Sequence, residues 1–381
     1  MGKDLDIMDQ FQNVRIKWPY ATHLVDKSAV KGLLPMVEGH DPGALVLCRV
    51  MTSGKHKDLE AQAGRKMSIF PGDVFVGVLG DRYATDQFEG IGRVTGPTGH
   101  ILGIGGVVGE VVSSNNRMPD PTTVEFLGRL ADAEGKPLYT QQFAALSSAP
   151  ATGVRPITVL SLGASMNSGK TTTAMQMVRS LTNAGHRVAA AKVTGTACLK
   201  DPNLMYDAGA VCVLDFTDAG WPSTANLSLE QLMSITGRIR AALEAHQPEF
   251  VIIEIADGIL QRETAMMLAH EPFRATIDAV TFAGPDALSV DSGVRRLREY
   301  GYPVIASAGI VANGQLGIQE VEKACGLRCL SGETILSGGL VATLRSIRER
   351  RMAGGDATSG GTTAGERESV PGTHGSSRAA Q

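Results

Sequence analysis

The sequence lacks the features that would place the protein in a membrane or outside the cell. No stretch of it approaches the roughly 18 consecutive apolar residues that a bilayer span requires. Residues 1–20 have no apolar core of the kind found in signal peptides. The five cysteines are scattered, and Cys325 and Cys329 have no second Cys/His pair at zinc spacing. We therefore expect a cytoplasmic protein with reduced, buried thiols and no membrane partner.

An excess of charge of either sign is also missing. The chain has 36 Lys and Arg against 39 Asp and Glu, a net charge of −3. This balance gives no reason to expect a nucleic-acid partner, because phosphate backbones are bound by basic surfaces. The length of 381 residues exceeds the roughly 100–200 residues of one domain, so we expect at least two.

The first half of the chain is rich in glycine and in short β-type runs such as "ALVLCRVM" and "DVFVGVLG". This pattern of glycines and short β-type runs predicts a small β-rich, barrel-like N-terminal module over residues 1–146. Residues 56–66 carry the one stretch there with a helical pattern. Residues 147–156, rich in Ser, Pro, Ala and Gly, are expected to form a linker.

The end of the chain changes composition. Residues 338–352 are expected to form a C-terminal helix, with Leu340, Leu344 and Ile347 on one stripe. Its arginines (Arg345, Arg348, Arg350 and Arg351) indicate a solvated face, or alternatively a surface for an anionic partner. Residues 353–381 have almost no apolar side chains and are expected to be a disordered tail.

Between these regions, over residues 157–337, near-continuous apolar strands alternate with helical stretches. This alternation predicts an α/β fold with a doubly wound, mainly parallel sheet covered on both faces. Ligands of such sheets bind beyond the carboxyl ends of the strands. The residues at those ends are therefore the candidates for function.

The first predicted strand leads into "GASMNSGKTTTA", residues 163–174. A phosphate-binding loop has Gly, four residues, and then Gly-Lys-Ser/Thr. The opening position here holds Ala164, with Gly163 one residue early. A loop between a strand and a helix still directs backbone N–H groups and the helix dipole at an anion. The expected nucleotide-binding residues of this loop are Ala164, Asn167, Ser168, Gly169, Lys170, Thr171 and Thr172.

Within that loop, Lys170 is expected to contact the β- and γ-phosphates and Thr171 to place its hydroxyl on Mg²⁺. The next strand ends at Lys192, which is expected to bind the terminal phosphate or an anionic substrate. The segment that follows it supplies three further expected substrate-binding residues: Thr194, Gly195 and Thr196.

A later strand, "FVIIEIADGIL", ends in two carboxylates. A carboxylate at the end of a buried strand is costly unless it is paired or binds a metal. Glu254 is our preferred Mg²⁺ ligand. Asp257 is the alternative ligand and a candidate substrate contact.

The run from "GASMNSGKTTTA" through "GHRVAAAKVTGTA", then "DPNLMYDAGA" and "VIIEIADGIL", resembles the dethiobiotin synthetase-like branch of P-loop NTPases over roughly residues 157–310. It is also similar to the accessory GTPase of molybdopterin-guanine dinucleotide biosynthesis. The resemblance implies that Lys192 contacts substrate and phosphate and that Glu254 binds magnesium. It implies a second magnesium ligand at Asp201 or Asp207.

The resemblance also bears on the base. It implies that Asn313, in "GIVANG", contacts adenine, and the chain has no Asn-Lys-x-Asp guanine signature near its last strands. Both points favour ATP over GTP.

Together these features predict a Mg²⁺-dependent, ATP-binding enzyme that transfers the γ-phosphoryl group to a small anionic metabolite, or activates it, as a ligase or kinase. Lys170 and Lys192 would be the catalytic residues, acting by positioning and charge neutralisation. The N-terminal module would select the substrate or contribute to a homodimer. One alternative is an NTPase switch or accessory protein that regulates a partner enzyme. Another is that the N-terminal module binds the functional ligand while the nucleotide has a structural role.

Overall fold

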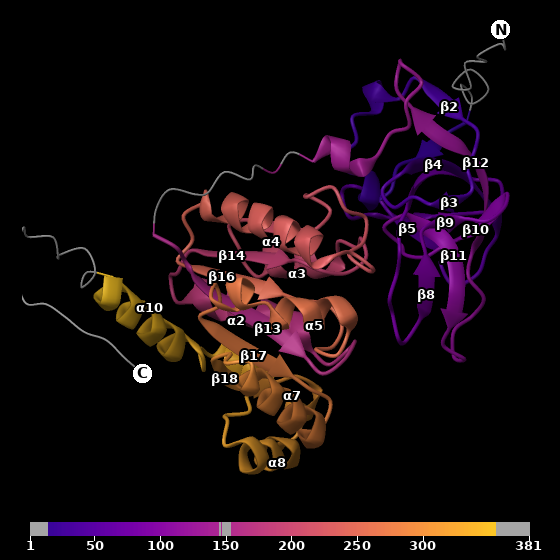
Figure 1. Ribbon diagram of the computed structural model, residues 1–381. Helices are drawn as coiled ribbons and strands as arrows, with labels where there is room; N and C mark the ends of the chain where they lie inside the picture. The colour runs from indigo at the N-terminus through magenta and orange to yellow at the C-terminus, as the bar shows by residue number, and fades with distance from the viewer. Residues whose placement is uncertain (1–13, 145, 147–153, 356–381) are drawn as a thin grey trace, which may run out of the picture.

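The computed structural model describes residues 14–144, 146 and 154–355. They form a β-rich N-terminal module and an α/β module that lie beside each other (Figure 1). Most of the predicted linker and nearly all of the predicted tail lie outside the described residues. In the described part, no helix is long and apolar enough to cross a membrane.

The N-terminal module is built almost entirely of short strands. Its elements are β1 (Ile16–Lys17), η1 (Tyr20–Thr22), η2 (Lys27–Ala29), β2 (Gly32–Leu34), β3 (Gly39–His40), β4 (Leu45–Thr52), β5 (Asp58–Glu60), β6 (Lys66–Ser68), β7 (Val74–Leu79), β8 (Phe88–Ile91), β9 (Arg93–Val94), β10 (Thr98–Ile101), β11 (Val107–Ser114), β12 (Thr123–Ala131) and η3 (Thr140–Phe143). Strand pairing runs from β4 to β7, β11, β10 and β12 and back to β4. These five strands pair in a closed circuit. In it, β7 and β11 are parallel and the other four pairs are antiparallel, so the strands do not form a simple meander.

The helical pattern of residues 56–66 is a wrong prediction. These residues form strand β5 and the turn that leads to β6. Leu59 is fully buried in the module's core, and the Glu60 N–H donates to the carbonyl of Ile104 at 2.7 Å. These tertiary contacts outweigh the local helical preference of the segment.

The α/β module alternates strands and helices along the chain. Its elements are β13 (Ile157–Gly163), α2 (Lys170–Asn183), β14 (Val188–Lys192), α3 (Lys200–Asp207), β15 (Val213–Asp215), α4 (Leu229–Glu244), β16 (Phe250–Glu254), α5 (Arg262–Ala269), α6 (Glu271–Arg274), β17 (Ala279–Ala283), α7 (Ala287–Glu299), β18 (Val304–Ala308), η4 (Ile310–Asn313), α8 (Gln315–Cys325), α9 (Gly332–Leu336) and α10 (Val341–Gly355). The six strands are parallel in the order β15-β14-β16-β13-β17-β18.

Alternating strand residues build a core on each face of this sheet. In β13, Leu160 and Leu162 pack with residues of α4, α5, α7 and α8. Ile157 and Val159 of the same strand pack with residues of α2, α3, α9 and α10. Helices therefore cover both faces, as Figure 1 shows, and the predicted α/β fold with a parallel sheet is confirmed.

The C-terminal helix differs from its predicted bounds. Helix α10 begins at Val341, after a turn in which Gly338 has φ 91°, and it continues to Gly355, inside the predicted tail. Leu340 and Leu344 are buried against the sheet. This burial anchors the start of the helix.

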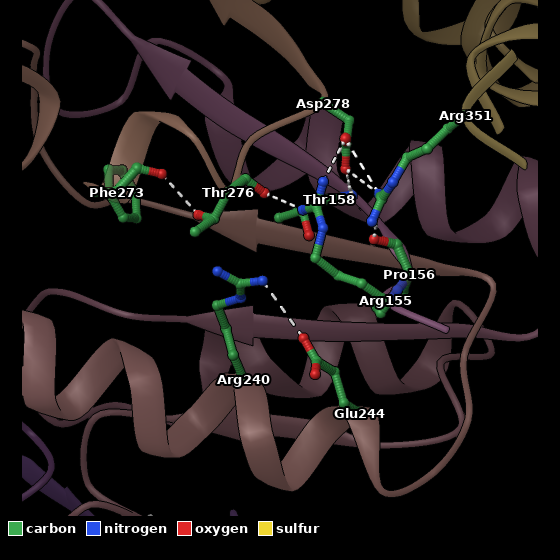
Figure 2. A network of polar contacts seen from close by, with 9 residues as sticks. All are labelled: Arg155, Pro156, Thr158, Arg240, Glu244, Phe273, Thr276, Asp278 and Arg351. Atoms are coloured by element: carbon green, nitrogen blue, oxygen red, sulfur yellow. Dashed lines mark hydrogen bonds and ion pairs between the residues drawn. The ribbon is translucent and has the colours of Figure 1, made fainter. Parts of the chain in front are cut away.

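The arginines of α10 are not simply a solvated face. Arg351 Nη1 lies 3.1 Å from Asp278 Oδ2, and Arg348 pairs with Glu249 at 3.0 Å. Arg155 Nη2 also contacts Asp278, at 2.7 Å, so one carboxylate joins α10 to the start of the α/β module (Figure 2). This network lies at the amino ends of the strands, the edge away from the predicted site.

Candidate functional site

A cavity of about 520 Å³ opens beyond the carboxyl ends of β13, β14 and β16. The α/β module lines it with the loop before α2, with the segment after β14 and with the ends of β14 and β16. The N-terminal module lines it with Arg82, Tyr83, Ala84 and Gln87. The site predicted from one half of the chain is therefore completed by the other half.

The loop before α2 contains two residues with positive φ, Asn167 and Gly169. Gly169 has φ 105°, and a Cβ atom there would lie 2.8 Å from the Cα of Gly309, so the position requires glycine. Asn167 has φ 60°, a left-handed conformation that asparagine adopts more readily than most residues. Helix α2 then begins at Lys170.

The displaced glycine of the motif has a steric explanation. A Cβ atom at Gly163 would lie 2.7 Å from Lys170 Cγ and 2.8 Å from the carbonyl oxygen of Ala283, and it would also collide with Ser168 Oγ. Ala164 is not among the residues with positive φ. At the start of the loop, the close approach that demands glycine therefore occurs at position 163, and alanine fits at 164.

Lys170 lies on the inner side of the loop. The residue is 5% exposed, and its Nζ donates to the carbonyl oxygen of Ser165 at 2.7 Å. Burial lowers the pKa of Lys170, while the nearby Glu254 and Asp257 act in the opposite direction. Ser161 Oγ donates to the carbonyl of Lys170 at 2.8 Å, which fixes the first turn of α2 on the strand before it.

Glu254 lies at the centre of the polar cluster. The register of β14 and β16 places it beside Lys192. Its Oε1 accepts a 2.8 Å hydrogen bond from Thr171 Oγ1, and its Oε2 is buried with no partner among the described residues. Burial raises the pKa of Glu254, and Lys192 opposes that rise.

Lys192 joins the carboxylates of the cluster. Its Nζ donates to Asp201 Oδ2 and lies 3.9 Å from Glu254 Oε1. Burial disfavours its charge, but Glu254 and Asp201 outweigh burial and raise the pKa of Lys192. Asp207 is exposed at the end of α3 and does not line the cavity. Of the two aspartates that the resemblance leaves open, the structure brings Asp201 to the site.

These residues fit a magnesium ion. The unpartnered Glu254 Oε2, the Thr171 hydroxyl and the Asp201 carboxylate are oxygen donors of the kind that Mg²⁺ prefers, and their residues line one cavity. No group of three or more His, Cys, Asp or Glu in the described part could hold a metal by itself. Mg²⁺ is commonly bound by one or two carboxylates together with substrate phosphates and water.

Four of the predicted binding residues do not line the cavity. These are Ala164, Ser168, Thr194 and Asn313. Thr194 is buried, and its Oγ1 accepts a 2.8 Å hydrogen bond from the N–H of Ala256, so it positions backbone rather than substrate. Asn313 is exposed at the end of η4, whose first N–H, from Ile310, donates to the carbonyl of Ser168.

The other predicted substrate-binding residues do line the cavity: Lys192, Gly195, Thr196 and Asp257. Asp257 has φ 58°, the left-handed region that is uncommon for residues other than glycine. Burial raises its pKa, against the opposing effect of Lys170. This carboxylate is therefore held near two lysines without a direct ion pair in the described part.

The sequence analysis assigned substrate selection to the N-terminal module but named none of the residues with which it lines the cavity. Arg82 Nη2 donates to Gln87 Oε1 at 2.8 Å, while Nη1 is buried with no partner among the described residues. Burial lowers the pKa of Arg82 to about 10. A polar loop, "GDRYATDQ", following a strand was the available signal, because functional residues concentrate on such loops.

Comparison with known proteins gives limited likeness. No family model matches the chain, and no curated protein matches it. Among solved structures it is similar to the signal recognition particle 54 kDa protein from Aeropyrum pernix K1 in complex with GDP. The identity is 18%, the match covers 56% of this chain and 53% of that chain, and the TM-score is 0.35.

Two other solved structures give comparable values. For a ParA family ATPase from Chlorobium tepidum TLS they are 13% identity, 54% of this chain, 99% of that chain and a TM-score of 0.31. For the signal recognition particle receptor FtsY from Elizabethkingia anophelis, the identity is 17%, the match covers 43% of this chain and 53% of that chain, and the TM-score is 0.28. The chain thus spans about half the length of the first and third of these proteins. Likeness at this level assigns the chain no activity.

Proposed function

We propose that the protein is a Mg²⁺-dependent, ATP-binding enzyme that transfers the γ-phosphoryl group to a small anionic metabolite. The observation that carries the proposal is the meeting of Lys170, Thr171, Lys192 and Glu254 in one cavity at the carboxyl ends of three parallel strands. A volume of about 520 Å³ lies within the range of roughly 300–1,000 Å³ typical of small-molecule sites.

Each side chain has a role in that reaction. The backbone N–H groups of the loop and the start of α2 bind the phosphates, and Lys170 adds a fixed positive charge. Lys192 stabilises charge that develops on the transferred group. Magnesium, held by Thr171, Glu254 and Asp201, would neutralise phosphate charge. No covalent intermediate with the protein is needed.

In the proposed reaction, the γ-phosphoryl group is transferred to a carboxylate of the acceptor. A carboxylate oxygen of the acceptor forms a bond to the γ-phosphorus, and the bond from that phosphorus to the β,γ-bridging oxygen breaks. The products are an acyl phosphate and a nucleoside diphosphate, and no proton is exchanged. Catalysis rests on in-line positioning and on electrostatic stabilisation.

The N-terminal module, for which we propose a barrel-like architecture, closes the site over the acceptor. Arg82 supports this role because it is a desolvated cation with a buried, unpartnered Nη1. A buried cation without a hydrogen-bond partner is energetically costly, so binding of an anionic group to Arg82 is favoured.

Binding of the nucleotide can be tested first. Lys170→Ala should abolish the rise in Tm that ATP with Mg²⁺ produces in the wild-type protein. Lys323→Ala, at an exposed position of α8, is the control and should keep the full rise. An unchanged rise in Lys170→Ala would remove this site as the nucleotide site.

A second function is supported by one contact. Asn167 of the loop before α2 donates to Asp86 of the N-terminal module, so a change of nucleotide at the loop could alter the module and regulate a partner enzyme. Product analysis separates the two functions. Phosphorylated product from a panel of small carboxylates supports the enzyme. Slow hydrolysis that a partner protein accelerates, with no such product, supports the switch.

A further inference from the structure

A second cavity of about 460 Å³ adjoins the first. The N-terminal module lines it with the segment from Lys55 to Leu59, Lys66 and the turn at residues 103–104. The α/β module lines it with residues 196–198, directly after the predicted substrate-binding segment. Neither the phosphate motif nor the proposed nucleotide chemistry requires this cavity.

The lining of the second cavity is strongly cationic. It contains Lys55, Lys57, Lys66 and Arg82 against one carboxylate, Asp58. Asp58 already accepts a 2.8 Å hydrogen bond from Ser68 Oγ. Within the described residues, the lysine ion pairs are those of Lys17 and Lys192, so the three lysines of the cavity are unpaired there. An anion would complete this arrangement.

Two buried nitrogens of the lining have no hydrogen-bond partner among the described residues: His56 Nδ1 and Arg82 Nη1. Burial, followed by the charge of Arg82, lowers the pKa of His56 to about 3, so its imidazole is neutral at physiological pH. Buried polar groups are normally paired. A ligand with oxygen acceptors would pair Arg82, and a polar group on the same ligand would pair the neutral imidazole.

The two cavities share part of their walls. Arg82, Gln87, Thr196 and Cys198 line both. Cys198 has a pKa raised to about 11 by burial, so it is a neutral wall of both cavities at physiological pH. The two cavities are therefore adjacent, with Arg82 and Thr196 on the wall that they share.

We propose that the second cavity binds a small metabolite bearing carboxylate or phosphate groups, and that this metabolite is the acceptor of the phosphoryl group. The acceptor role rests on the proposed function. Binding of the oxyanion itself does not, because it depends on Lys55, Lys57, Lys66 and Arg82 and not on the nucleotide loop.

The proposal is tested on the full-length protein without nucleotide, by calorimetric titration with glutarate and, separately, with glycerol 3-phosphate. At least one of the two should bind, and its Kd should rise about ten-fold in Lys57→Gln and in Lys66→Gln, equivalent to about 1.4 kcal/mol for each contact. Lys136→Gln, at an exposed site of the same module, should bind as the wild type does. The probe that binds distinguishes a carboxylate site from a phosphate site.

Absence of binding by both probes, or binding that is equal in wild type, Lys57→Gln and Lys66→Gln, would overturn the proposal. Lys170→Ala separates this result from the proposed function: it should lose nucleotide binding and keep the wild-type Kd for the probe. Loss of probe binding in Lys170→Ala would place the probe in the nucleotide cavity and would also overturn the second site.

Discussion

The amide of Asn167 donates a 2.8 Å hydrogen bond to the carboxylate of Asp86. Asn167 belongs to the loop that precedes α2, and Asp86 to the segment of the N-terminal module that also carries Arg82. The loop before α2 is thereby tied directly to a residue 81 positions earlier in the chain. This contact makes the coupling of the two modules measurable.

We expect that removing this hydrogen bond will weaken nucleotide binding by roughly three-fold, because an exposed hydrogen bond contributes about 0.5–1.5 kcal/mol. Asp86→Ala removes the acceptor, and Asn167→Gly removes the donor while preserving the positive φ. The measurement is the Kd for ATP in a double-mutant cycle, with Glu134→Ala, at an exposed position, as control. If the fold-changes in Kd of the two single variants multiply in the double variant, the two residues are not coupled.

The position of the loop glycine gives a second prediction. Gly163→Ala should lower the free energy of unfolding by about 1–3 kcal/mol and abolish ATP binding, because the new Cβ has no room. Ala164→Gly should cost less than about 1 kcal/mol and keep ATP binding, because it restores the usual motif glycine at a position that does not need it. Urea denaturation and ATP titration of both variants test this. Equal damage by the two substitutions would contradict the steric explanation.

The role of Glu254 is tested by removing its charge. In Glu254→Gln we expect the part of ATP affinity that depends on Mg²⁺ to fall about ten-fold or more, since magnesium binds through carboxylate oxygens. ATP affinity measured in EDTA should change little. Glu320→Gln, on the exposed side of α8, is the matched control. Retention of full magnesium dependence in Glu254→Gln would show that the ion is held elsewhere.

Asp215, at the contact between the modules, gives a pH prediction. Its Oδ2 accepts from Tyr20 OH at 2.9 Å and its Oδ1 from the N–H of Thr217 at 2.7 Å. Burial, and then the charge of Asp218, raise its pKa from 3.8 to about 6. The neighbouring His23 Nε2 lies 3.2 Å from Asp218 Oδ1, and its own pKa is also raised, by Asp218 against the effect of burial.

Proton binding determines whether the stability of the fold rises or falls with pH. Between pH 3.8 and about 6 the folded state keeps the proton on Asp215 while the unfolded state loses it, so stability falls as pH rises through this window. The raised pKa of His23 acts in the same direction, because a protonated imidazole stabilises the fold until pH passes its folded pKa.

Asp215→Asn should therefore flatten the fall of Tm between pH 3.8 and about 6, where Asp215 contributes a change of up to roughly 3 kcal/mol to the unfolding free energy. The measurement is Tm across this pH range, with the exposed Asp207→Asn as control. A slope in Asp215→Asn equal to that of the wild type would assign the pH dependence to other groups.

The site was partly predictable because some of its determinants are local. A strand, a short loop and a helix follow one another within residues 157–183, so the pattern indicates the phosphate loop without knowledge of the rest of the fold. Lys192 and Glu254 could be predicted because each ends a buried apolar strand, where a charge is unfavourable unless a partner is present. The choice between Asp201 and Asp207 could not be made, because it depends on how α3 packs against the sheet.

The sequence by itself determined the alternation of apolar strands and helices, and hence the α/β sheet and the edge at which its charged residues gather. The tertiary structure decided which residues complete the cavity. Arg82 and Asp86 reach the loop before α2 only because the modules dock through contacts such as those of Tyr20 with Asp215 and Asn226 with Asp81. Such contacts join residues more than a hundred positions apart and have no local periodicity or motif. That is why the second cavity, too, was visible only in the folded chain.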